Sequence, residues 1–133
     1  MDIVGIGVDI VEIARFDGAM QRQGQKLLDR LFLPSEQAFC QPQHEPARCY
    51  SARFAAKEAV SKALGTGIGA ELGWHDIELG RKDTGAPFIT LHGRGAETAT
   101  RKGITEVLIT LSHSEHYAVA IAIATGKCPS AGG

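Results

Sequence analysis

The chain lacks an excess of charge of either sign. Its 133 residues carry 14 Lys and Arg against 15 Asp and Glu, for a formal net charge of −1 at pH 7. Proteins that bind nucleic acid tend to be basic as a whole, so we expect no nucleic-acid partner. No apolar run is long enough to cross a bilayer, so we expect no membrane partner either. Any electrostatic partner must be met by a local patch.

Cysteine is scarce. The three cysteines, Cys40, Cys49 and Cys128, form neither an even disulfide set nor a close pair of metal ligands. The N-terminus has no signal-peptide pattern. We therefore expect reduced thiols in a cytoplasmic protein.

Repeats, linkers and low-complexity core segments are also missing. A chain of this length fits one domain. We predict a single compact domain over residues 1–126 and a disordered tail over residues 127–133, which ends in Pro, Ser, Ala and two Gly.

Hydrophobic periodicity predicts an α+β domain with an antiparallel sheet packed against helices. The expected elements are a strand at 2–9, a helical segment at 12–30 interrupted by Gly18 and Gly24, a short helix capped by Ser35, a helix at 53–64, strands at 77–79 and 87–91, a short helix at 95–102, and strands at 107–111 and 117–124. The last four strands are expected to pair as two hairpins.

The most informative segment is the helix predicted over residues 53–64, which ends at a glycine-rich loop. At about 100° per residue, its Ala, Val and Leu residues fall on one side. The other side carries Lys57, Glu58, Ser61 and Lys62, so one carboxylate lies among two ammonium groups. An anion and a hard cation could meet there. The alternative is a solvated face, in which Glu58 and Lys62 form a pair worth about 0.3–0.5 kcal/mol.

The N-terminal strand has one face with few side chains. With a period of two, Val4, Ile6, Val8 and Ile10 line one face, and Ile3, Gly5, Gly7 and Asp9 line the other. Glycine inside a strand indicates a bulge or the close approach of another group to the backbone. A carboxylate therefore ends a face of small residues. The alternative is that Asp9 caps the following helix.

Together these two segments resemble the holo-[acyl-carrier-protein] synthase family of the 4′-phosphopantetheinyl transferase superfamily. The resemblance rests on GIGVDIVEIARF at residues 5–16, RFAAKEA at 53–59 and SKALGTGIG at 61–69. It continues through Gly85-Ala86-Pro87 and LSHSEHYA at 111–118, so nearly the whole chain is covered. The resemblance implies a 4′-phosphopantetheinyl transferase-like α+β fold and a homotrimer with active sites between subunits.

The implied activity is transfer of the 4′-phosphopantetheine group from coenzyme A to a serine of apo acyl carrier protein, with release of adenosine 3′,5′-bisphosphate. The resemblance names Asp9 and Glu58 as ligands of the cofactor Mg²⁺, an ion that binds through one or two carboxylates plus substrate phosphate. Lys62 completes the implied catalytic group by neutralising charge on the pyrophosphate. The residues leave open whether Glu58 or a metal-bound water takes the serine proton.

The resemblance also supplies candidates for binding coenzyme A. They are Arg53, Lys57, Lys62 and the Gly65 loop for phosphate, Gly85 and Pro87 beside adenine, and His113 near the nucleotide phosphates. Two of these assignments have a simpler alternative, because a histidine between strands is commonly a surface residue and Gly85–Pro87 is by itself an ordinary hairpin turn.

Basic residues recur at helical spacing after the first strand. Arg15, Arg22, Lys26 and Arg30 are spaced by seven, four and four residues, which places them on one stripe of a helix. In the family this region meets the acidic acyl carrier protein, so Arg15, Arg22 and Lys26 are the predicted docking residues. The alternative is a solvated face broken by two glycines.

The strand predicted over residues 117–124 is apolar on both faces. Such a strand is expected to be covered on both sides, which gives a physical motive for a trimer. The alternative is a central strand covered by helices of its own chain.

Two other function classes fit the residues. A different Mg²⁺-dependent phosphate-ester enzyme would keep Asp9, Glu58 and Lys62 without a basic docking surface. A non-catalytic module that binds coenzyme A or a nucleotide would not need both carboxylates.

Overall fold

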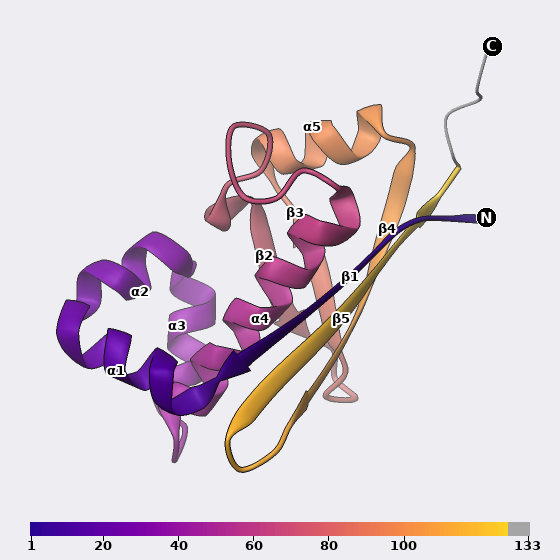
Figure 1. The fold of residues 1–133 in the computed structure, drawn as a ribbon. Coiled ribbons are helices and arrows are strands. Elements are labelled where there is room, and N and C mark those ends of the chain that lie inside the picture. Colours follow the sequence, from indigo (N-terminus) through magenta and orange to yellow (C-terminus); the bar gives the residue numbers. More distant parts are fainter. Residues whose placement is uncertain (128–133) are drawn as a thin grey trace.

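A three-stranded antiparallel sheet carries the helices of the domain on one face (Figure 1). The computed structural model describes residues 1–127. The sheet has the order β1 (Asp2–Glu12), β5 (Tyr117–Gly126) and β4 (Ile104–His113), while β2 (Ile77–Arg81) and β3 (Pro87–Leu91) pair as a separate hairpin. The predicted fold class and both hairpins are confirmed. Apart from Lys127, the predicted tail lies outside the described residues.

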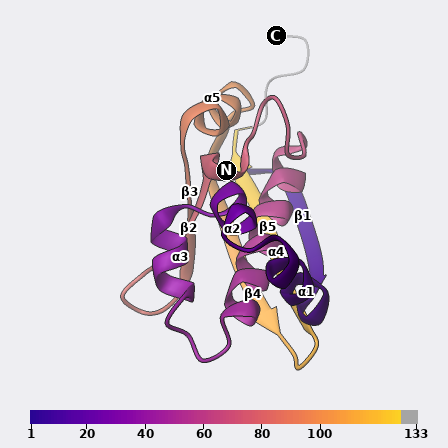
Figure 2. The ribbon, with the colours of Figure 1, turned by 90° about the vertical axis from the view of Figure 1, so that its left-hand side faces the viewer.

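The helices occupy the inner side of the sheet. They are α1 (Ile13–Gln23), α2 (Gln25–Leu31), α3 (Pro34–Cys40), α4 (Pro46–Leu64), the short 3₁₀ helix η1 (Trp74–Asp76) and α5 (Gly93–Arg101). α4 runs along the sheet, with α1, α2 and α3 at one end and α5 at the other (Figures 1 and 2). Across residues 1–127, no helix combines the length and the apolar character that crossing a membrane requires.

The first helical segment breaks at one glycine only. Gly24 has φ of +62° and separates α1 from α2, whereas Gly18 stays inside α1. Glycine is tolerated within a helix at a cost of about 1 kcal/mol, so Gly18 needs no interruption. Ser35 does not cap α3, because its N-cap is Leu33.

β1 packs on α4 through its glycine face. A Cβ at Gly5 would overlap the carbonyl oxygen of Ala63, and a Cβ at Gly7 would overlap that of Ala59. The predicted close approach to this strand is therefore confirmed, and α4 is the group that approaches. Asp9 is not a helix cap, since the residue before α1 is Glu12.

α4 is longer and more deeply buried than its sequence pattern indicates. It begins at Pro46, and Lys57 and Ser61, which periodicity placed on the polar side opposite the core, are only 0% and 1% exposed. The predicted amphipathic helix is wrong because β1 and β5 cover one side of α4 while α1, α3 and β2 contact others. Of the predicted polar face, only Glu58 and Lys62 reach solvent.

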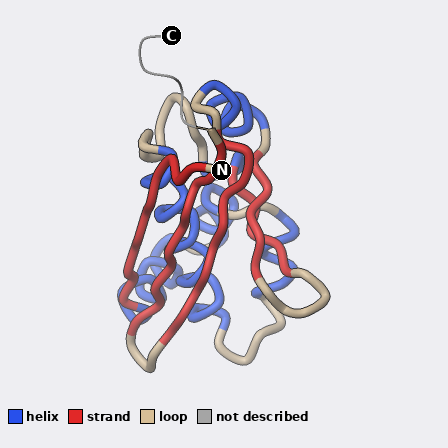
Figure 3. Tube along the Cα trace, turned by 90° about the vertical axis from the view of Figure 1, so that its right-hand side faces the viewer, coloured by secondary structure: helices blue, strands red, loops and turns tan. Residues whose placement is uncertain are grey.

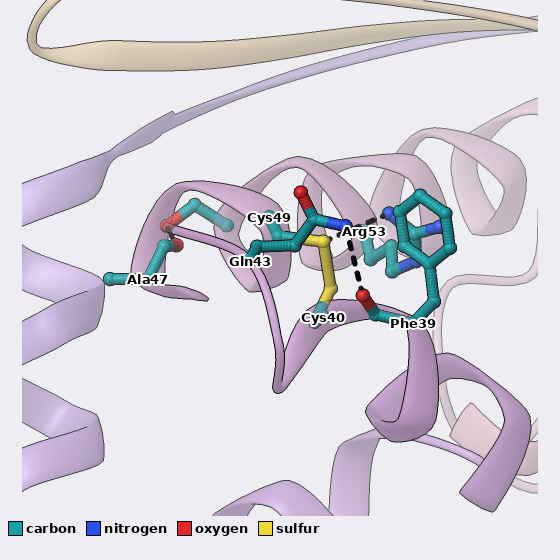
Figure 4. Close-up of a disulfide and its surroundings, with 7 residues drawn as sticks. Phe39, Cys40, Gln43, Ala47, Cys49 and Arg53 are labelled. Carbon is teal, nitrogen blue, oxygen red and sulfur yellow. Dashed lines mark hydrogen bonds between the residues drawn. A yellow bond between two sulfur atoms is a disulfide. The ribbon is translucent and has the colours of Figure 1, made fainter. Parts of the chain in front are cut away.

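Cys40 and Cys49 form a disulfide that joins the end of α3 to the first turns of α4 (Figure 4). The expectation of reduced thiols is therefore wrong for this pair. The loop between the helices folds back so that the two Cα atoms lie 5.5 Å apart, within the usual span of a disulfide. Cys128 lies outside the described residues.

The outer face of the sheet has no helix over it within residues 1–127 (Figure 3). Its large exposed side chains include Ile6, Val8 and Ile10 of β1, Ile121 of β5 and Leu108 of β4. The inward alanines of β5 are fully buried. Residues 1–127 thus cover this strand, which is apolar on both faces, on one face only.

Candidate functional site

Asp9 and Glu58 lie at one cleft, a hollow of about 500 Å³ between β1, α1 and α4. Asp9 reaches it from the strand whose glycines contact α4, and Glu58 reaches it from the helix itself. Arg15 of α1 and the rings of Phe54 and Tyr117 complete part of its wall. The two carboxylates that sequence reasoning selected from distant segments therefore share one cleft.

Lys62 contacts Asp9, one of these two carboxylates. Its Nζ donates to Oδ1 of Asp9 at 3.2 Å and to the carbonyl oxygen of Val8 at 2.9 Å. The Lys62 side chain is 51% exposed and that of Asp9 is 18% exposed, so both are accessible to a ligand. The three residues predicted as catalytic are thus brought together.

The electrostatics of the cleft favour a cation. Burial raises the pKa of the Glu58 carboxyl and the nearby Asp9 carboxylate raises it further, while Lys62 opposes both effects. Two like charges in a partly desolvated site repel each other, and a divalent ion between them would relieve that repulsion. Within residues 1–127, no three His, Cys, Asp or Glu side chains gather as a larger ligand set. Two carboxylates in an open cleft suit Mg²⁺.

A second hollow of about 440 Å³ adjoins Lys62. Lys62, Gly65 and Lys102 line it together with residues 4–6 of β1. Gly65 ends α4 with φ of +80°, a conformation that only glycine adopts without strain. Two ammonium groups beside an exposed turn suit a phosphate. Sequence reasoning found Lys62 and Gly65 but missed Lys102, because no sequence signal relates the end of α5 to the end of α4.

Tyr117 is a second residue to which sequence reasoning gave no role in the site. It is 46% exposed and lines the cleft beside Asp9 and Glu58. The pairing of β1 with β5 places Tyr117 opposite Glu12. Only the register of β5 against β1 shows that Tyr117 lies near the cleft, and this register cannot be read from the sequence.

Lys57 does not reach the cleft. Its Nζ lies 2.7 Å from Oε1 of Glu36 and donates to the carbonyl oxygens of Leu31 at 2.8 Å and Trp74 at 3.0 Å. An ammonium group has three donors, so these partners leave none for a phosphate. The structure therefore contradicts the prediction that Lys57 binds coenzyme A.

Arg53 is buried beneath Phe39. Its guanidinium carbon lies 4.2 Å from the ring centroid, and its Nη1 donates to Sγ of Cys49 at 3.3 Å (Figure 4). Burial and the nearby Arg81 lower the pKa of Arg53 to about 10. Arg53 lines neither hollow, so its predicted contact with phosphate is not brought about within this chain and stays a prediction.

Gly85, Pro87 and His113 lie away from both hollows. Gly85 occupies the β2–β3 turn with φ of +89°, and Pro87 begins β3. His113 is the exposed last residue of β4. None of the three lines the cleft or the second hollow of its own chain, and their predicted contacts with coenzyme A stay predictions.

The break at Gly24 divides the basic stripe. Arg15 lines the cleft, whereas Arg22, Lys26 and Arg30 line a separate hollow of about 510 Å³ where α1 meets α2. A single straight stripe is therefore wrong, because it required one continuous helix. All four side chains remain exposed.

The raised pKa of Glu58 predicts a stability cost that a mutation would remove. Because the folded state holds this proton to higher pH than the unfolded state, the protonated carboxyl favours folding. The contribution is fully present below the unfolded pKa of about 4.3 and is lost as pH rises through the folded pKa, where the carboxyl ionises in the folded protein. We expect Glu58→Gln to raise the melting temperature in EDTA at about pH 7, with the gain vanishing toward pH 4. Circular dichroism measures it, with Glu97→Gln on the exposed side of α5 as control. An unchanged or lower melting temperature would contradict the assigned electrostatics.

Comparison with known proteins adds an independent finding. Residues 5–122 match the family model of the 4′-phosphopantetheinyl transferase superfamily. The chain is 49% identical over 128 residues to the holo-[acyl-carrier-protein] synthase of Desulforudis audaxviator, an alignment that covers 96% of this chain and 97% of that relative.

Solved structures agree with the sequence match. The holo-[acyl-carrier-protein] synthase of Neisseria meningitidis superposes with a TM-score of 0.88 at 31% identity, over 93% of this chain and 99% of that one. The Helicobacter pylori synthase, solved in complex with coenzyme A, gives 0.81 at 36% identity, over 90% and 99%. This chain therefore belongs to the holo-[acyl-carrier-protein] synthase family of the 4′-phosphopantetheinyl transferase superfamily.

Proposed function

We propose that this enzyme transfers the 4′-phosphopantetheine group of coenzyme A to a serine hydroxyl of apo acyl carrier protein, with Mg²⁺ as cofactor and adenosine 3′,5′-bisphosphate as the second product. The observation that carries the proposal is that Asp9 and Glu58 share one cleft while Lys62 is bonded to Asp9. The name of the relatives supports the acceptor, and the coenzyme A complex of the Helicobacter pylori synthase supports the donor.

Each of the three residues has a separate role in the proposed transfer. The serine oxygen forms a bond to the phosphorus that carries pantetheine, and the pyrophosphate bond to the nucleotide breaks. Asp9 and Glu58 would hold Mg²⁺, which supplies charge neutralisation at the pyrophosphate. Lys62 lies close enough to Asp9 to add a positive charge for the leaving phosphate. Glu58, with its raised pKa, or a water at the cleft accepts the serine proton.

The second hollow is the proposed place for the nucleotide phosphates. Lys102 and the Gly65 turn lie there beside Lys62, which links the hollow to the cleft. Phosphate contacts of this kind position the donor for an in-line attack, which is the main demand of such a reaction.

We also propose a homotrimer that forms through the outer face of the sheet. Ile6, Val8 and Ile10 on β1 are 64%, 53% and 64% exposed, and no part of the described chain covers them. A continuous apolar face of this kind marks an interaction surface. Gly85, Pro87 and His113 line neither hollow of their own chain, so their proposed contacts with coenzyme A require sites shared between subunits.

The acyl carrier protein is proposed to dock on Arg15, Arg22 and Lys26. These side chains are exposed, and Arg15 lies in the cleft where the serine must arrive. The hollow at the α1–α2 junction adds a local positive patch to a chain of nearly zero net charge. Such a patch steers and holds an acidic partner.

The mass of the carrier tests the activity. With coenzyme A, Mg²⁺ and apo carrier protein, we expect the carrier to gain one phosphopantetheine group, and to gain none in EDTA. Asp9→Ala or Glu58→Ala removes a proposed ligand and should slow transfer by about 100-fold or more while the circular dichroism spectrum is kept. Near-wild-type transfer by either variant would remove that residue from the site. Binding of coenzyme A without transfer, or its cleavage without a modified carrier, would favour one of the two alternative functions.

Light scattering tests the assembly. We expect the wild-type protein to have three times the mass of one chain, and Ile121→Lys to dissociate it by placing a charge on the apolar face. Glu97→Lys on α5 serves as control for an added charge. If sites are shared between subunits, the dissociated Ile121→Lys variant also loses transfer activity. A monomer with full transfer activity would contradict the proposal of shared sites.

Charge reversal tests the docking surface. Arg15→Glu combined with Arg22→Glu should raise the KM for the carrier by about tenfold at low salt, with a smaller effect at high salt, because the contact is electrostatic. The KM for coenzyme A should stay unchanged. Arg101→Glu on α5 is the matched control. An unchanged carrier KM, or a parallel rise in the KM for coenzyme A, would exclude this surface.

A further inference from the structure

A buried ion pair joins α4 to α3, and neither of its residues lines the cleft. Lys57 Nζ and Glu36 Oε1 are 2.7 Å apart, and neither side chain has any exposed area. The same Nζ donates to the carbonyl oxygens of Leu31 and Trp74. The proposed chemistry makes no use of this pair.

Glu36 extends the network to two backbone amides. Its Oε1 accepts from the N–H of Leu33 at 2.8 Å, and its Oε2 accepts from the N–H of Leu79 at 3.0 Å. Through these bonds the pair joins the end of α2, the start of α3, η1 and β2 to the middle of α4. Each charged atom of the pair has a partner, which is the condition under which a buried ion pair is tolerated.

The opposite side of α4 packs on β1 through small residues. There the backbone of α4 contacts Gly7 at Ala59 and Gly5 at Ala63, and the half-exposed Lys62 reaches across to Val8 and Asp9. The Lys62 contact is exposed to solvent, which weakens it, and a long side chain can follow a small rotation of the helix. The Lys57–Glu36 pair on the other side is fully buried, so the same rotation would break its bonds without replacement by water.

Lys57 directly precedes Glu58. Successive residues of a helix point about 100° apart, so fixing the direction of one fixes the direction of the next. A rotation of α4 that moved Glu58 would pull the Lys57 ammonium away from its three partners and leave a buried charge unpaired, which is strongly unfavourable.

We propose that the Lys57–Glu36 pair is a positioning device for the cation site: it sets the rotation of α4 that holds Glu58 opposite Asp9. The pair thereby sets the affinity of the cleft for a divalent cation without touching it. This inference rests on the proposed function, in which Glu58 is a cation ligand. A pair that served stability alone would leave the affinity of a folded variant unchanged.

Titration with Mn²⁺ followed by electron paramagnetic resonance, with saturating coenzyme A and no carrier, tests the inference. We expect Lys57→Met to weaken Mn²⁺ binding by about tenfold or more, the range found for residues that orient metal ligands. The double variant Lys57→Met with Glu36→Gln leaves no buried unpaired charge and is expected to recover the melting temperature but not the affinity.

Leu72→Ala is the matched control, because Leu72 is fully buried in the core and lies outside the pair. It should lower the melting temperature while Mn²⁺ affinity stays at the wild-type value. A double variant that is folded and binds Mn²⁺ like the wild type would overturn the inference and leave the proposed function standing, as would equal weakening by Leu72→Ala. Absence of Mn²⁺ binding by the wild type, or full binding by Glu58→Gln, would instead overturn the proposed cation site.

Discussion

The contact between the glycine face of β1 and the alanine face of α4 is the constraint on which the site depends. Side chains at Gly5 or Gly7 would overlap the carbonyl oxygens of α4, so the strand can approach the helix only where it has none. This approach is what allows a short carboxylate on the strand to reach the same cleft as Glu58. Two segments that are far apart in the sequence thereby form one candidate cation site.

The same contact leaves α4 almost without a solvated face. A helix buried on nearly all sides must satisfy its charged residues internally, and Lys57 does so through Glu36 and two carbonyl oxygens. Glu58 is left with burial and a neighbouring carboxylate, which raise its pKa. A carboxyl with a perturbed pKa is typical of a functional site. A buried ion pair whose atoms all have partners is typical of a structural role. Adjacent residues of one motif thus have opposite roles.

Much of this arrangement could be predicted from the sequence. Periodicity gave the hairpins and the bare strand face, because alternation and glycine are local signals. The resemblance to a known family then selected Asp9, Glu58 and Lys62, which the fold brings together. These successes share one property: each depends on local pattern or on a long matching motif.

The errors share the opposite property, since each needed a contact between distant segments. Periodicity cannot tell a solvated lysine from one that pairs with a buried glutamate. It therefore could not show that Lys57 is buried against Glu36 and has no free donor for a phosphate. Counting cysteines could not show that the loop after α3 returns Cys49 to Cys40. Lys102 and Tyr117 carried no signal, because only the packing of α5 and the register of β5 bring them to the site.

The affinity of a Gly7→Ala variant for Mn²⁺, with coenzyme A present, tests the central claim most directly. Gly126→Ala is a matched comparison, because an added Cβ there also overlaps a backbone carbonyl, that of Gly103, but at the far end of β5. We expect both variants to melt at lower temperature and only Gly7→Ala to bind Mn²⁺ more weakly, since only it displaces β1 from α4 beside Asp9. Equal Mn²⁺ affinity in the two folded variants would contradict the account.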